Sequence, residues 1–202
     1  MSATSSFYDK NAQQLADQYN SVSFESVHSS WKKYWPESGD TVLDVGAGSG
    51  RDARWYIAQG CSVVAVEPSK TLRHIGQKDC SNKLTWIDDS LPTLESVKQL
   101  SQLFDLVVLS AIWQHVPVHQ RPKAIVNISE LLSDKGRLVI TLRYGEFDDG
   151  RETFGVSVTE LEELCLKVGL LVNHVSTDED SFQRNEIKWK TVVLSKASPA
   201  EG

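Results

Sequence analysis

Short apolar segments alternate with amphipathic segments along most of the chain. The apolar segments are typical of strands covered on both faces, and we expect strands at 41–46, 61–67, 83–88, 104–110 and 137–143. The amphipathic segments predict helices at 51–59, 69–77, 93–102, 117–133 and 158–168. Three glycines stand where helices are expected to end: Gly60, Gly136 and Gly169. This alternation predicts a parallel sheet flanked by helices and joined by right-handed crossovers.

The end of the chain departs from this alternation. Two further strand-like segments, Leu170 to Thr177 and Lys188 to Ser195, are separated by a polar loop with no room for a helix. Strands joined without a crossover helix pair antiparallel, as a hairpin. We therefore expect a doubly wound α/β sheet that is mostly parallel and carries an antiparallel strand at its end.

The first part of the chain has a different pattern. Residues 7–35 have apolar side chains at helical spacing, and Pro36 with the following Ser-Gly-Asp turn ends this region. The chain has 202 residues, a length that suits one domain. We expect a single domain, 1–202, made of an N-terminal helical segment (1–36), an α/β core (37–195) and a frayed tail (196–202).

Composition excludes several classes of protein. The net charge is −6 and the isoelectric point is near 5.4, which argues against a general nucleic-acid binder. Three unclustered cysteines (Cys61, Cys80 and Cys165) fit neither a disulfide framework nor a metal site, and we expect reduced thiols in a cytoplasmic protein. No apolar run reaches membrane-spanning length, and the N-terminus is too polar for a signal peptide.

A glycine-rich turn follows the first expected strand, in the sequence Val-Leu-Asp-Val-Gly-Ala-Gly-Ser-Gly at 42–50. Glycines allow a tight turn and a close approach of ligand to backbone. The dinucleotide fingerprint G-x-G-x-x-G requires glycine where this chain has Arg51. Asp44, just before the turn, repels a pyrophosphate but attracts the sulfonium and ammonium groups of S-adenosylmethionine. The turn therefore indicates a methyl-donor site.

Polar residues also stand at the ends of the next expected strands. Parallel α/β sheets bind ligands at the carboxyl ends of their strands, so these side chains meet at one edge. Glu67 lies 21 residues after Gly46, a spacing suited to hydrogen bonds from ribose hydroxyls. The third strand ends at Asp88 and Asp89, which can accept from an exocyclic adenine amine, and the fourth ends at Ser110. Taken singly, each of these carboxylates is explained equally well as a solvated strand end, a turn former or a helix cap. Together they predict a cleft for a cationic nucleoside.

These motifs resemble those of the class I S-adenosylmethionine-dependent methyltransferases, over residues 7–195. Besides the glycine turn, the resemblance rests on Val-Ala-Val-Glu-Pro at 64–68, Trp-Ile-Asp-Asp-Ser-Leu-Pro at 86–92, Phe-Asp-Leu-Val-Val at 104–108 and the approach to the fifth strand at 131–138. It implies strand order 3-2-1-4-5-7-6 with strand seven antiparallel. It also implies that the methionine amino group lies near Asp44 and Gly46, the ribose near Glu67, and the adenine near Asp88 or Asp89. The predicted cofactor-binding residues are Asp44, Gly46, Ala47, Gly48, Arg51, Glu67, Pro68, Asp88, Asp89 and Ser110.

Two residues are candidates for the reaction itself. His115 follows the fourth strand, beside the expected donor methyl, and can take a proton near neutral pH. Its alternative role is that of a structural histidine at a helix start. Arg143 ends the fifth strand, and we expect it to face the acceptor pocket, where arginines can bind a carboxylate or other oxyanion. Arg151 and Arg184 lie in nearby loops, and the simpler interpretation is that they balance neighbouring aspartates.

The short chain leaves little sequence beyond the cofactor fold and an N-terminal segment, which in similar enzymes closes over the cofactor as a lid. We therefore expect a small-molecule acceptor, such as a carboxylate-bearing metabolite or a metalloid oxyanion. The resemblance is closest to small bacterial enzymes of the ubiquinone-biosynthesis-like and tellurite-resistance-like groups. One alternative is an RNA or protein methyltransferase with a basic rim near Lys32, Lys33 and Arg51. Another is a module that binds S-adenosylmethionine without catalysis. No metal is expected.

Overall fold

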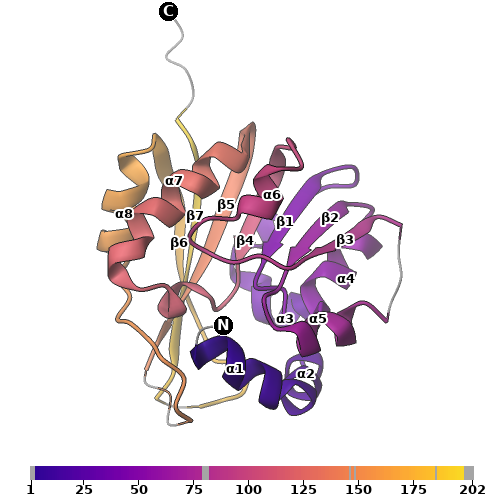
Figure 1. The fold of residues 1–202 in the computed structure, drawn as a ribbon. Helices are drawn as coiled ribbons and strands as arrows, with labels where there is room; N and C mark the ends of the chain where they lie inside the picture. Colours follow the sequence, from indigo (N-terminus) through magenta and orange to yellow (C-terminus); the bar gives the residue numbers. More distant parts are fainter. Residues whose placement is uncertain (1–2, 79–81, 146, 148, 185, 198–202) are drawn as a thin grey trace, which may run out of the picture.

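The computed structural model describes residues 3–78, 82–145, 147, 149–184 and 186–197, so Cys80 and the end of the tail (198–202) lie outside the described residues. One sheet crosses the molecule with strand order β3-β2-β1-β4-β5-β7-β6, which confirms the expected order (Figure 1). The strands are β1 (Thr41–Val45), β2 (Ser62–Val66), β3 (Leu84–Ile87), β4 (Phe104–Leu109), β5 (Leu132–Tyr144), β6 (Leu170–Asp178) and β7 (Lys188–Lys196). Strand β7 pairs antiparallel with both β5 and β6.

The register of the central strands brings their carboxyl ends together. Asp44 of β1 lies opposite Ala65 of β2 and Val108 of β4, close to the end of each strand. The four residues from Val42 to Val45 are all buried, as expected for a strand with helices on both sides. The sheet therefore presents the residues that follow β1, β2 and β4 at one common edge.

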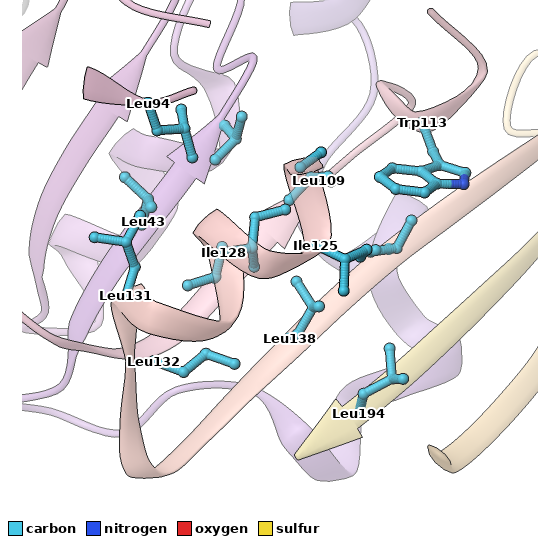
Figure 2. Packing of buried hydrophobic residues seen from close by; sticks show 14 of the residues in the cluster. Leu43, Leu94, Leu109, Trp113, Ile125, Ile128, Leu131, Leu132, Leu138 and Leu194 are labelled. Carbon is cyan, nitrogen blue, oxygen red and sulfur yellow. The ribbon is translucent and has the colours of Figure 1, made fainter. Parts of the chain in front are cut away.

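Helices cover both faces of the sheet. One face packs against α6 (Glu95–Lys98), α7 (Arg121–Leu131) and α8 (Val158–Leu166). Figure 2 shows how Ile125 and Ile128 of α7 pack close to Leu138 of β5 in this layer. On the opposite face, α4 (Arg51–Ala58) packs with the N-terminal segment, and α5 (Lys70–Gly76) follows β2.

The N-terminal segment consists of α1 (Ala3–Lys10), α2 (Ala12–Asn20), α3 (Phe24–His28) and the 3₁₀ helix η1 (Ser29–Tyr34). Helices α1 and α2, drawn in indigo, lie next to α5 (Figure 1). Phe24 and Trp31, from α3 and η1, are buried against α4. The expected helical segment thus contributes to the core as well as covering part of the sheet.

Two expected helices differ in the structure. The helix expected at 93–102 is reduced to Glu95–Lys98: Leu94, directly before it, has a φ of 49°, and Ser101, three residues after it, has a φ of 51°, both outside helical geometry. The helix expected at 117–133 starts at Arg121, after the 3₁₀ turns η2 (Trp113–His115) and η3 (Val118–Gln120). Gly136 lies within β5 rather than at a helix end, and a Cβ there would lie 2.7 Å from the carbonyl oxygen of Phe104.

Two of the three cysteines, Cys61 and Cys165, are buried, without a disulfide. No helix within the described residues is long and apolar enough to cross a membrane. The same residues contain no group of three or more His, Cys, Asp or Glu side chains that could hold a metal ion.

Candidate functional site

The glycine turn connects β1 to α4 and is held by the neighbouring strand. The backbone N–H groups of Gly46 and Ala47 donate to the carbonyl oxygen of Val66, at 2.8 and 2.9 Å. Gly46 has a φ of +77°, and a Cβ built there would lie 2.2 Å from Cδ1 of Ile112. Glycine is therefore required at Gly46 both by backbone conformation and by close packing. The turn leaves its backbone accessible from the side of the strand ends.

Asp44 is buried at the end of β1, with an exposed fraction of 1%. Its Oδ2 atom has no hydrogen-bond partner among the described residues. Burial raises the pKa of Asp44 well above its ordinary value, and the charges of Asp52 and Glu67 add to this shift, while Arg51 opposes it. A buried carboxyl oxygen without a donor favours a ligand that brings a cation or an N–H group to it.

Glu67 follows β2, and its carboxylate is held by two backbone groups. Oε2 accepts from the N–H of Gly48 at 2.8 Å, and Oε1 accepts from the N–H of Ser69 at 2.8 Å. Burial raises the pKa of Glu67 to about 7, although both hydrogen bonds oppose the shift. Each carboxylate oxygen can accept more than one hydrogen bond, so Glu67 is oriented while keeping the capacity to bind a hydroxyl.

The two adjacent aspartates after β3 have different surroundings. Asp89 accepts hydrogen bonds from the N–H groups of Ser96 and Val97 in the first turn of α6, at 2.8 and 3.2 Å. Asp88 forms an ion pair with Arg73 at 2.7 Å, and its side chain is 67% exposed. Asp89 thus has the helix-capping role that is common for aspartate, whereas Asp88 has an oxygen directed to a single cation.

A cavity of about 1030 Å³ connects these strand ends with the region above β5, β6 and β7. This volume lies at the upper end of the range for small-molecule sites. Every predicted site residue lines the cavity: Asp44, Gly46, Ala47, Gly48, Arg51, Glu67, Pro68, Asp88, Asp89, Ser110, His115 and Arg143. Lys32 and Lys33, which with Arg51 formed the basic rim of the RNA or protein alternative, are not among the lining residues.

Arginine side chains gather at the other end of the cavity. Arg143 is buried on β5, with its guanidinium carbon 3.6 Å from the ring centre of Phe147, and Arg151 lies 3.8 Å from the same ring centre. Arg151 also pairs with Asp149, and Arg184 pairs with Asp180. Both loop arginines therefore pair with neighbouring aspartates, as the simpler interpretation expects, and both also line the cavity.

Arg143 donates from Nη1 to the backbone oxygen of Gly145 at 2.6 Å, and two further arginines lie close enough to act on its charge. Burial lowers its pKa, and the positive charges of Arg184 and Arg151 lower it further, against the smaller opposing effects of Asp180 and Asp149. Arg143 nevertheless stays charged, because guanidinium groups do not lose their proton in proteins. An anion bound beside Arg143 would relieve this repulsion.

His115 lies in η2, and both nitrogens of its ring have a hydrogen-bond partner. Nδ1 is 3.0 Å from the carbonyl oxygen of Glu152, so Nδ1 carries the proton and donates. Nε2 is 3.3 Å from the hydroxyl of Tyr8, which also accepts from Arg151 at 3.2 Å. Burial lowers the pKa of His115, and the charges of Arg151 and Arg143 act in the same direction. The ring is therefore neutral near pH 7, with a lone pair on Nε2.

Several lining residues were not singled out from the sequence. Oε1 of Gln114 and Oδ1 of Asp178 are buried without a partner among the described residues. Thr141 accepts from the N–H of Ala111 at 2.7 Å, and Thr191 donates to Asp178 at 2.5 Å. Strand alternation provides a signal for Thr141, which lies two residues before Arg143 and hence on the same face of β5. No comparable signal marks the others.

Comparison with known proteins matches the chain to methyltransferases. The family model described as "Methyltransferase domain" matches residues 8–174. An uncharacterized methyltransferase of Alkaliphilus oremlandii is 27% identical over 105 residues, which cover 49% of this chain and 44% of the relative. One from Staphylococcus carnosus is 24% identical over 165 residues, covering 75% of this chain and 77% of the relative. The chain thus spans less than half of the length of the Alkaliphilus relative.

Solved structures share the fold. A TehB-like S-adenosylmethionine-dependent methyltransferase from Corynebacterium glutamicum has a TM-score of 0.68 at 22% identity, covering 96% of this chain and 99% of that one. The magnesium protoporphyrin IX methyltransferase of Synechocystis, with bound S-adenosylmethionine, has a TM-score of 0.63 at 15% identity, covering 92% and 79%. The chain belongs to the methyltransferase domain family and shares its Rossmann-like fold with these two methyltransferases.

Proposed function

We propose that the protein transfers a methyl group from S-adenosylmethionine to a small molecule that carries an oxyanion. The main support is one continuous cavity, which joins the strand-end carboxylates to Arg143. A cationic nucleoside matches the first end of the cavity, and an anionic acceptor matches the second. The N-terminal segment (1–36) serves as a lid in this proposal, because Tyr8 and Tyr19 line the cavity.

The residues at the glycine turn fit the cofactor. Asp44, with its unpartnered Oδ2, receives the methionine ammonium, and the backbone of Gly46, Ala47 and Gly48 forms the surface against which the methionine part lies. Glu67 accepts the ribose hydroxyls. When bound, S-adenosylmethionine supplies an electrophilic methyl group on a positively charged sulfur.

The adenine end of the site is assigned to the next strand. We assign the amine of adenine to Asp88, since Asp89 is already engaged by α6. Pro68 and Ser110 line the cavity after β2 and β4 and complete the proposed cofactor-binding set.

Methyl transfer is an in-line displacement, so the chain contributes mainly by aligning the acceptor and excluding water. The acceptor atom forms a bond to the methyl carbon while the carbon–sulfur bond breaks. Where the acceptor atom carries a proton, Nε2 of His115 takes it, either directly or through the hydroxyl of Tyr8. Arg143 positions the acceptor by a charge-assisted hydrogen bond to its oxyanion.

The acceptor class can be tested with labelled cofactor. Purified protein is incubated with methyl-labelled S-adenosylmethionine and a bacterial extract, which is then separated by size. We expect label in the low-molecular-mass fraction, retained on an anion-exchange column. Label in protein or RNA instead would contradict the proposed acceptor, and an absence of transfer together with tight cofactor binding would favour the non-catalytic module.

The role of Arg143 can be tested on the same acceptor. Arg143→Gln is expected to raise the KM for the acceptor roughly 10- to 100-fold, the loss of one charge-assisted hydrogen bond, and to leave the KM for S-adenosylmethionine nearly unchanged. Arg137→Gln is the matched control, because Arg137 lies on the same strand but pairs with Asp40 outside the cavity. Equal acceptor KM values for the two variants would contradict the assignment.

A further inference from the structure

A chain of buried hydrogen bonds leads from the N-terminal segment to the glycine turn. The indole Nε1 of Trp31 lies 3.1 Å from Nδ1 of His28, and Nε2 of His28 lies 2.9 Å from Oδ2 of Asp52. The other oxygen of Asp52 accepts from Nε of Arg51 at 2.6 Å. Trp31 and His28 are fully buried, and Asp52 is 6% exposed. These hydrogen bonds therefore connect η1 and α3 with the first two residues of α4.

The direction of these hydrogen bonds follows from chemistry. An indole N–H can only donate, so Nδ1 of His28 accepts and carries no proton. The proton of the ring is on Nε2, which donates to Asp52. The ring of Phe24 lies 4.5 Å from the ring of His28 between centres and restricts its position. His28 is thus held in one tautomer and one orientation, both directed at Asp52.

Asp52 in turn holds Arg51. Burial opposes the ionisation of Asp52, but the charge of Arg51 and the hydrogen bonds from His28 and Arg51 lower its pKa. The carboxylate takes the Nε–H of Arg51, and the terminal nitrogens remain available to the cavity and, at 3.4 Å, to the backbone oxygen of Tyr19. Arg51 lines the cavity. Asp52 therefore fixes the Nε edge of the Arg51 guanidinium, in a side chain that lines the cavity.

The charges near Asp44 indicate what Arg51 binds. Arg51 is the cation that acts on Asp44, against the repulsion of Asp52 and Glu67. In the proposed function Asp44 receives the methionine ammonium. The methionine carboxylate is attached to the same carbon as that ammonium, so it must lie near Asp44 as well. A carboxylate placed among these acidic side chains requires a cation, and Arg51 provides it.

We propose that His28 and Trp31 are positioning residues for recognition of the cofactor's carboxylate, acting through Asp52 on Arg51. This inference rests on the proposed cofactor site. The alternative is that the buried chain only stabilises the packing of the N-terminal segment against α4. The two differ in one measurable respect, because positioning of Arg51 affects ligands that have the carboxylate, whereas a loss of packing affects all adenosine ligands alike.

The experiment compares two ligands by calorimetry. S-adenosylhomocysteine has the methionine carboxylate, and 5′-methylthioadenosine lacks the whole amino-acid group. His28→Phe conserves an aromatic ring but removes both hydrogen bonds. We expect it to weaken S-adenosylhomocysteine binding about tenfold and 5′-methylthioadenosine binding less than twofold, and we expect His28→Gln, which can donate and accept, to restore part of the loss.

A matched control and a milder variant complete the test. His174→Phe removes a histidine that also bonds to η1, through the backbone oxygen of Ser30, but lies outside the cavity, and it should leave both affinities unchanged. Trp31→Phe removes the indole donor together with part of a buried ring, and it carries the test if His28→Phe does not fold, with an expected two- to threefold loss for S-adenosylhomocysteine alone. Parallel losses for both ligands, or none, would overturn the inference. Wild-type protein that binds neither ligand would instead refute the proposed cofactor site.

Discussion

The carboxylate of Glu67 accepts a hydrogen bond from the backbone N–H of Gly48 at 2.8 Å, which ties the end of β2 to the glycine turn after β1. The two features that first indicated a methyl-donor site are therefore parts of one hydrogen-bonded unit. The same carboxylate is buried and has a raised pKa of about 7. Its protonation is consequently expected to affect the site near neutral pH.

The first prediction concerns this titration. Ribose hydroxyls bind better to the ionised carboxylate than to the acid, so the affinity for S-adenosylhomocysteine should increase as the pH rises through about 7. Glu67→Gln should remove the part of the pH dependence centred there and weaken binding at pH 8. Calorimetric titrations between pH 6 and 8 measure both effects. A wild-type affinity that does not change over this range would contradict the assignment.

The stability of the free protein should respond in the opposite sense. The folded state retains the Glu67 proton up to about pH 7, whereas the unfolded chain releases it near the ordinary value of 4.5. The contribution of this group to the free energy of unfolding is thus fully present below pH 4.5 and is lost as the pH rises through 7. Denaturant unfolding of wild type and Glu67→Gln, compared at pH 5 and 8, should show a smaller decrease for the variant.

The second prediction concerns the glycine turn. Gly46→Ala forces a positive φ on alanine and brings its Cβ against Ile112, which should cost roughly 1–3 kcal/mol of stability and weaken S-adenosylhomocysteine binding at least tenfold. Gly155→Ala is the control, since nothing lies within 4 Å of a Cβ at that exposed glycine. Thermal unfolding and calorimetry would reveal the difference. Equal behaviour of the two variants would exclude a close backbone approach at Gly46.

The third prediction concerns His115. With the neutral imidazole of His115 as the proposed base, kcat should decrease as the pH falls through the lowered pKa of His115, below its ordinary 6.5. His115→Asn should lower kcat by about 100-fold or more and leave the KM for S-adenosylmethionine unchanged. The control is His119→Asn, an exposed histidine outside the cavity. If His115→Asn kept the wild-type kcat and pH profile, the histidine would be structural.

The fourth prediction concerns the N-terminal segment as a lid. Tyr8 contacts both His115 and Arg151 across the cavity, and Asp9 accepts from Ser69 at 2.6 Å after β2. A bound cofactor beneath these contacts should make the segment harder to open. We therefore expect tryptic cleavage after Lys10 to slow when S-adenosylhomocysteine is added.

Cleavage after Lys135, an exposed lysine outside the cavity, provides the internal reference. It should proceed at the same rate with and without S-adenosylhomocysteine. Equal slowing at both lysines would indicate general stabilisation rather than closure of a lid.

The sheet order could be predicted because it depends on signals that lie within each segment. Fully apolar strands such as Val63–Val66 indicate burial on both faces, and the missing helix before Lys188 requires an antiparallel strand. The short α6 could not be predicted in the same way. Leu94, directly before this helix, has a left-handed conformation that fixes where the helix begins, and local periodicity gives no sign of such a conformation.

The residues of the candidate site also differ in whether the sequence could predict them. Residues at or just after a strand end, such as Asp44 and Glu67, could be located because the edge of a parallel sheet brings them together. His28 could not, because it lies in a separate helical segment, and its contact with Asp52 exists only after that segment packs on α4. Likewise, the sequence left Asp88 and Asp89 equivalent, and the capping of α6 by Asp89 distinguishes them.

In the proposed function, carboxylates at successive strand ends form a site for a positively charged sulfur nucleoside. Calorimetry of the wild-type protein with S-adenosylmethionine, S-adenosylhomocysteine and NADH tests it most directly. We predict saturable heat with both sulfur nucleosides and none with NADH, whose pyrophosphate would face Asp44. Binding of NADH together with no heat from either sulfur nucleoside would contradict the account.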